Sequence, residues 1–105
     1  MDLLVRIRRA VLAGRVVFTR KATEERENDG LAEEEVRESI VNASAIYKSI
    51  RSHRKRQTKG TRPAEMLHVI YGTTFTGIVV YTKGKLLVER GVETYYVLIS
   101  ARRSD

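Results

Sequence analysis

The sequence predicts one α+β domain, residues 1–105, in which two or three helices precede an antiparallel sheet of four or more strands. Residues 2–13 carry apolar side chains at helical spacing, and residues 24–38 are rich in glutamate. From residue 45 onward, runs rich in Val, Ile, Tyr and Thr alternate with turns that contain glycine. The 105 residues, 42% of them hydrophobic, suffice for a single core. We therefore expect the helices to cover one face of the sheet.

Three segments are predicted to be helical. The apolar stripe of the first consists of Leu3, Leu4, Ile7, Val11 and Leu12. Gly14 is expected to end this helix, and a second helix is expected to begin after Thr19 as N-cap and to end at Gly30. A third helix is expected over residues 32–43, because three glutamates in its first turn suit the helix dipole.

The predicted strands alternate with turns. They are residues 16–19, 45–52, 66–73, 76–83, 86–89 and 94–102, with a turn expected at Gly84. Successive side chains of a strand point to opposite faces, so each strand offers two sets. The sets with the polar members predict one surface lined by His68, Tyr81, Lys83, Ser100 and Arg102, with Lys48 added from the first of the long strands. A shift of one residue would move any strand's set to the other face.

Such a surface could cleave RNA without a metal. The 2′-hydroxyl of RNA can attack the neighbouring phosphorus if one group takes its proton, cations stabilise the developing charge, and an acid protonates the leaving 5′ oxygen. Lysine, arginine, tyrosine and histidine can share these roles. For His68 and for the tyrosines, a purely structural role is the alternative.

A basic run separates two of the predicted strands. Residues 51–62 contain no acid and six cations, which are Arg51, Arg54, Lys55, Arg56, Lys59 and Arg62. A basic loop presented by a folded scaffold is suited to binding phosphate. The alternative is a solvated charged run on an ordinary surface.

Charge and composition narrow the function further. Residues 24–38 hold eight acids and two arginines, a net charge of −6, whereas the whole chain carries +7, so the remaining residues carry +13. The basic body suggests a polyanionic partner, of which RNA is the first choice. The acidic run lacks metal-ligand spacing and is interpreted as a solvated helix face.

The chain has no cysteine and two histidines, so we expect neither a metal nor another cofactor. No apolar run suits a signal peptide or a membrane span, which favours a cytoplasmic protein without a membrane partner.

Six segments, in order, are similar to those of a known family. They are AGRVVFTRKA, VRESIV, IYKS, LHVIY, TGIVVYTK and YYVLISARR. Their order resembles the MqsR-like toxins and the uncharacterised domains related to them, within the RelE/ParE-like group of bacterial toxin–antitoxin pairs. The resemblance spans nearly the whole chain and implies a RelE-like fold of helices followed by a curved antiparallel sheet.

The resemblance also implies an activity and a partner. MqsR-like toxins are metal-independent endoribonucleases that cut mRNA and are silenced by a cognate antitoxin. By this resemblance Lys48 matches a lysine implicated in cleavage and Tyr81 a tyrosine of the active surface. His68 stands where the toxin that gives the family its name has glutamine, and either Arg102 or Arg103 falls near a C-terminal basic residue of the site.

The sequence thus predicts an RNA-cleaving toxin. Its candidate catalytic residues are Lys48, His68, Tyr81, Lys83 and Arg102, and the cations of 51–62 together with Arg103 are candidates for binding the phosphate backbone. An acidic antitoxin segment would occupy the same cations. Two alternatives stay open: an inhibitor of a protein target, as in ParE-like toxins, and an RNA- or DNA-binding module without catalysis. The oligomeric state, a homodimer included, is not decided by the sequence.

Overall fold

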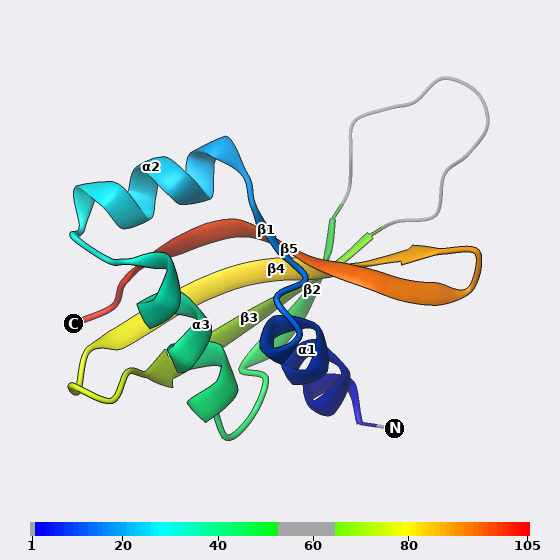
Figure 1. Ribbon diagram of the computed structural model, residues 1–105, viewed down its shortest axis with the longest axis horizontal. Helices are drawn as coiled ribbons and strands as arrows, with labels where there is room; N and C mark the ends of the chain where they lie inside the picture. Colours follow the sequence, from blue (N-terminus) through cyan, green and yellow to red (C-terminus); the bar gives the residue numbers. More distant parts are fainter. Residues whose placement is uncertain (1, 53–64) are drawn as a thin grey trace.

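The computed structural model describes residues 2–52 and 65–105. Three helices come first and most of the sheet follows (Figure 1), which confirms the predicted α+β class. The elements are α1 (Leu3–Leu12), β1 (Val16–Phe18), α2 (Arg20–Asn28), α3 (Glu33–Asn42), β2 (Lys48–Ser52), β3 (Glu65–Thr73), β4 (Val79–Glu89) and β5 (Val92–Arg103). The strand order is β1-β5-β4-β3-β2, and the pairing is antiparallel except between β1 and β5.

A side-chain hydrogen bond marks the start of each helix, and Thr19 is the N-cap of α2 as predicted. The Asp2 side chain accepts a hydrogen bond from the backbone N–H of Leu4, and the Thr19 side chain accepts one from Ala22. At α3 the Glu35 carboxylate reaches back to the backbone N–H of Ala32, at 2.9 Å. Each bond satisfies a donor at a helix start that has no partner within the helix.

The core lies between the sheet and the helices. Its buried members include Ile7 of α1, Ile40 of α3, Ile70 of β3 and Leu98 of β5. In Figure 1, α1 and α3 lie on the same side of the curved sheet. Helix α3 approaches β3 so closely that a Cβ added at Gly72 would lie 1.7 Å from the backbone oxygen of Ser39. Glycine is therefore required at position 72 for the helix to pack on the sheet.

The predicted turn at Gly84 is wrong. Gly84 lies inside β4, which continues to Glu89, so the two predicted strands 76–83 and 86–89 are one. A Cβ on Gly84 would lie 2.7 Å from ring carbons of Tyr96, which is fully buried. The glycine thus makes room for an aromatic ring on the neighbouring strand. The turn that joins β4 to β5 lies at Arg90 and Gly91, whose φ values of 54° and 76° suit a tight hairpin.

Helix α2 lies along β5, beyond the end of the short β1. The Glu25 carboxylate accepts the backbone N–H of Ala101 at 3.1 Å, and the Asp29 carboxylate accepts that of Arg103 at 2.8 Å. Two members of the acidic run therefore bind the sheet edge, where the sequence had suggested a solvated helix face.

Candidate nucleic-acid interface

The strand register places four of the five candidate catalytic residues on one face of the sheet. Tyr81 is paired with Tyr71 and with Arg102, while Lys83 is paired with Val69, which is also paired with Lys48. Directly paired residues point to the same face. The next pair along β4, Thr82 with Ala101, is fully buried toward the core. We call the other surface the open face; its members are Tyr47, Lys48, Tyr71, Tyr81, Lys83 and Arg102.

Three tyrosines and an arginine form a row across the open face. The Arg102 guanidinium lies 4.2 Å from the centre of the Tyr81 ring. The rings of Tyr81 and Tyr71 meet edge to face at 5.5 Å, and those of Tyr71 and Tyr47 at 5.2 Å. The Lys48 ammonium lies 5.9 Å from the Tyr47 ring, so both ends of this aromatic row carry a cation.

Arg102 is held in place from the sheet edge. Its guanidinium donates to the Ser100 hydroxyl at 3.3 Å, and that hydroxyl donates to the Glu25 carboxylate at 2.5 Å. Lys21 pairs with the same carboxylate at 3.6 Å. Burial raises the pKa of Glu25, but hydrogen bonds from Ser100 and Ala101 and the charges of Lys21 and Arg102 outweigh burial, so the net pKa is lowered. Glu25 is therefore ionised at neutral pH. Its carboxylate fixes the Ser100 hydroxyl, which in turn accepts the hydrogen bond from Arg102.

His68 lies on the face of the sheet opposite to the one the sequence predicted. His68 is paired with Gly84, and Gly84 points to the opposite face from its neighbour Lys83. The ring of His68 therefore points to the face that the helices cover, here called the helix side, and it is 6% exposed. Its Nδ1 lies 2.8 Å from the Ser49 hydroxyl. Burial, and then the charge of Arg6, lower the pKa of His68. The expectation that His68 shares a surface with Tyr81 and Arg102 is therefore wrong.

Two of the cations assigned to the phosphate backbone also point away from the open face. Arg51 is paired with Met66 and alternates in direction with Lys48. Arg103 is paired with the buried Val80, and its guanidinium binds Asp105 at 3.2 Å. Of the two C-terminal arginines, Arg102 is thus the one that belongs to the open face. The other five cations, Arg54, Lys55, Arg56, Lys59 and Arg62, lie outside the described residues.

The structure adds three residues that sequence reasoning did not assign to the site. Tyr47 precedes Lys48 directly, a signal that could have been used. Tyr71 alternates in direction with His68, so the prediction that put His68 on the open face excluded Tyr71 from it. The position of Glu25 depends on α2 lying beside β5, for which the sequence carries no local signal.

The described residues contain no group of three or more His, Cys, Asp or Glu side chains that could hold a metal ion. Among residues 2–52 and 65–105, no helix combines the length and hydropathy that a membrane span requires. Comparison with protein-family models, with curated proteins and with solved structures found no match.

Proposed function

We propose that the open face binds single-stranded RNA and that the protein cleaves this RNA without a metal, as the toxin of a toxin–antitoxin pair. The observation that carries the proposal is the aromatic row with Arg102 at one end and Lys48 at the other. The resemblance to MqsR-like toxins supports the same function.

Base stacking is the first part of the proposal. Tyr47 is 66% exposed and Tyr71 is 40% exposed. Because neighbouring rings meet edge to face and not in a stack, ring surface remains available to bases. Stacking of this kind tolerates any base and is a common way to hold single strands. The cations beside the rings would hold the phosphates that connect the bases.

Cleavage is the second part. The 2′-oxygen would form a bond to phosphorus while the bond from phosphorus to the 5′ oxygen breaks, which leaves a 2′,3′-cyclic phosphate and a 5′-hydroxyl. Tyr81 would donate its proton to the leaving 5′ oxygen, while solvent water takes the 2′ proton and afterwards reprotonates the Tyr81 phenolate. Arg102 and Lys83 would stabilise the charge on the phosphorane, and Lys48 would hold a neighbouring phosphate.

The test is incubation of the purified protein with mRNA in EDTA, followed by analysis of the product ends. We expect fragments that carry a 2′,3′-cyclic phosphate. Replacing Lys48 and Tyr81 together should abolish cleavage while the fold is kept. His68→Gln is the matched control, because His68 lies on the opposite face and its replacement should leave cleavage unchanged. Intact RNA at stoichiometric protein would refute the cleavage part.

RNA binding without cleavage is the second candidate. It is favoured by one observation, the burial of His68, which removes from the open face the side chain best suited to proton transfer at neutral pH. RNA that is bound tightly and recovered intact would support this candidate. In either case we propose that an antitoxin silences the protein by placing an acidic segment on Lys48, Lys83 and Arg102.

A further inference from the structure

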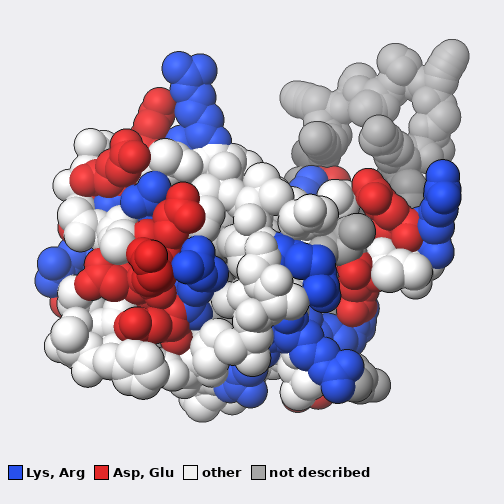
Figure 2. Space-filling view, viewed as in Figure 1, with Lys and Arg blue, Asp and Glu red and all other residues white. Residues whose placement is uncertain are grey.

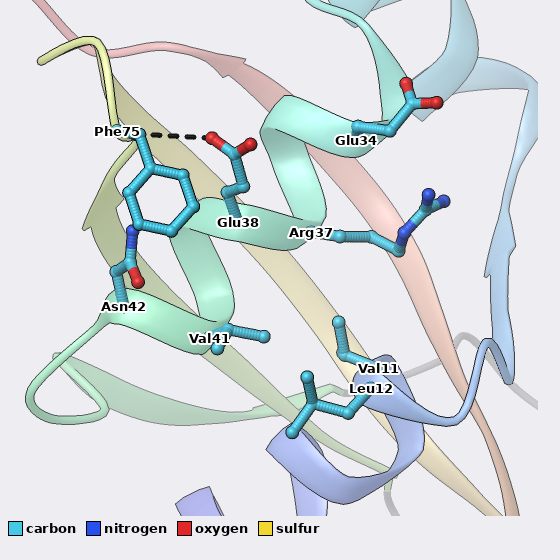
Figure 3. A pocket seen from close by; sticks show the side chains of 8 residues that line it. All are labelled: Val11, Leu12, Glu34, Arg37, Glu38, Val41, Asn42 and Phe75. Carbon is cyan, nitrogen blue, oxygen red and sulfur yellow. Dashed lines mark hydrogen bonds between the residues drawn. The ribbon is translucent and has the colours of Figure 1, made fainter.

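A pocket of about 330 Å³ lies between the end of α1 and α3, beside the turn from β3 to β4. Its apolar lining includes Leu12, Val41 and Phe75, and its charged lining includes Glu34, Arg37 and Glu38. In Figure 3 the two carboxylates lie along one side, and Leu12 and Val41 along the other. The pocket faces the helix side, whereas the open face is the other surface of the sheet, so the proposed RNA site does not account for it.

Phe75 is a large apolar side chain that is exposed to solvent on a turn tied to α3. It is 79% exposed, and its backbone N–H donates to the Glu38 carboxylate at 3.2 Å. The Asn42 side chain donates to the backbone oxygen of Thr73 at 2.8 Å, which ties the same turn to α3 a second time. Leu12, at the end of α1, is 70% exposed. Because two hydrogen bonds tie this turn to α3, the backbone that carries Phe75 need not be ordered when a partner binds.

The rim of the pocket is negatively charged, which suits a basic partner. In Figure 2 the acidic side chains gather over α2 and α3. Arg37 is paired with Glu33 at 3.7 Å, so Glu34 and Glu38 leave the rim of the pocket negative. Residues 24–38 carry −6 in a chain that is otherwise +13. A basic partner would be attracted to this region, whereas the rest of the chain carries a net positive charge.

We propose that this α1–α3 pocket docks a short segment of another protein, one with two or three apolar anchors and Lys or Arg beside them. The apolar anchors would pack on Leu12, Val41 and Phe75, and the cations would face Glu34 and Glu38. The RNA site and this docking site could be occupied at the same time.

The test is selection of random 15-residue peptides from a display library on the intact protein. We expect the selected peptides to combine Leu, Ile or Phe with a net positive charge. Phe75→Ser and Leu12→Ser should each weaken the best peptide by about tenfold or more, as loss of a central anchor does. Val88→Ser is the matched control, because Val88 is 51% exposed in β4 and lies outside the pocket. Glu34→Gln should weaken binding by about twofold to fivefold, and more at low salt.

Four outcomes would overturn the proposal. They are a failure to enrich peptides relative to the Leu12→Ser/Phe75→Ser double variant, enrichment of acidic peptides, equal binding to the Phe75→Ser variant, and self-association of the chain that Phe75→Ser abolishes. The last would assign the pocket to a second copy of this chain. Binding of a single-stranded RNA should be unchanged in Phe75→Ser, which separates this test from that of the proposed function.

Discussion

Replacing Tyr71 with alanine tests the aromatic row at its centre, since the Tyr71 ring contacts both Tyr47 and Tyr81. Stacking of a base on an aromatic ring contributes roughly 1–3 kcal/mol. Because 1.4 kcal/mol is a factor of ten, we expect the Kd for single-stranded RNA to rise by about 5- to 150-fold. Two edge-to-face contacts of about 0.5–1.5 kcal/mol each are also lost, so the free energy of unfolding should fall by about 1–3 kcal/mol.

The assay is fluorescence anisotropy of a labelled 12-nucleotide RNA, with urea unfolding of each variant measured in the same buffer. Tyr71→Phe keeps the ring and should bind within about twofold of the parent. Tyr95→Ala is the matched control, because Tyr95 is also 40% exposed but is paired with Leu87, away from the row. If Tyr71→Ala and Tyr95→Ala weaken binding equally, or if neither does, the rings do not hold bases and the argument for the row fails.

Three further predictions concern stability and charge. The pKa of His68 in the folded protein lies below the usual 6.5, so near that pH the unfolded chain binds more protons, and the contribution of His68 to stability should be lost as the pH falls below about 6.5. Urea unfolding between pH 5 and 7.5 should show a free energy of unfolding that decreases toward low pH, and His68→Gln should reduce this slope. Equal slopes in the two proteins would contradict the prediction. Gly84→Ala should lower the free energy of unfolding by about 1–3 kcal/mol, since its Cβ meets the Tyr96 ring at 2.7 Å; an unchanged urea midpoint would count against that packing. Lys83→Gln should reduce the slope of log Kd against log salt by about 0.7, the value for one phosphate of a single strand. Lys85→Gln is its control, because Lys85 already forms an ion pair at 2.8 Å, and equal slopes in the two variants would refute the assignment of Lys83.

The parts of the fold that were predictable are those fixed by local signals. Leu4, Ile7 and Val11 of α1 are buried as helical spacing predicts, whereas Leu12 of the same predicted stripe is 70% exposed. The start of α2 follows from the capping ability of Thr19. The sequence does not predict the place of Gly84 in β4, because a glycine in a turn and a glycine beside a large ring have the same sequence signature. The difference lies in Tyr96, which is twelve positions away in the chain.

The candidate site was predictable only in part, for a related reason. Alternation divides the side chains of a strand into two sets but does not state which set the helices cover. The choice was correct for Tyr81, Lys83 and Arg102, but for His68 it was reversed, because a polar side chain can be buried when a neighbour such as Ser49 binds it. The role of Glu25 could not be predicted from the sequence, because its partners Ser100 and Ala101 lie 75 and 76 positions away in the chain.

The carboxylates that α2 places on β5 have a consequence for self-association. An unpaired strand edge is a template on which a second chain can add a strand, and Glu25 and Asp29 occupy two of the N–H groups that such a strand would use. At neutral pH this part of β5 is therefore protected against the addition of a further strand. Because the pKa of Glu25 is lowered, its part of this protection should persist in mild acid and fail only below the usual range of a carboxyl group. Light scattering during an acid titration would detect the loss as aggregation, and aggregation that begins near pH 6 would have another origin.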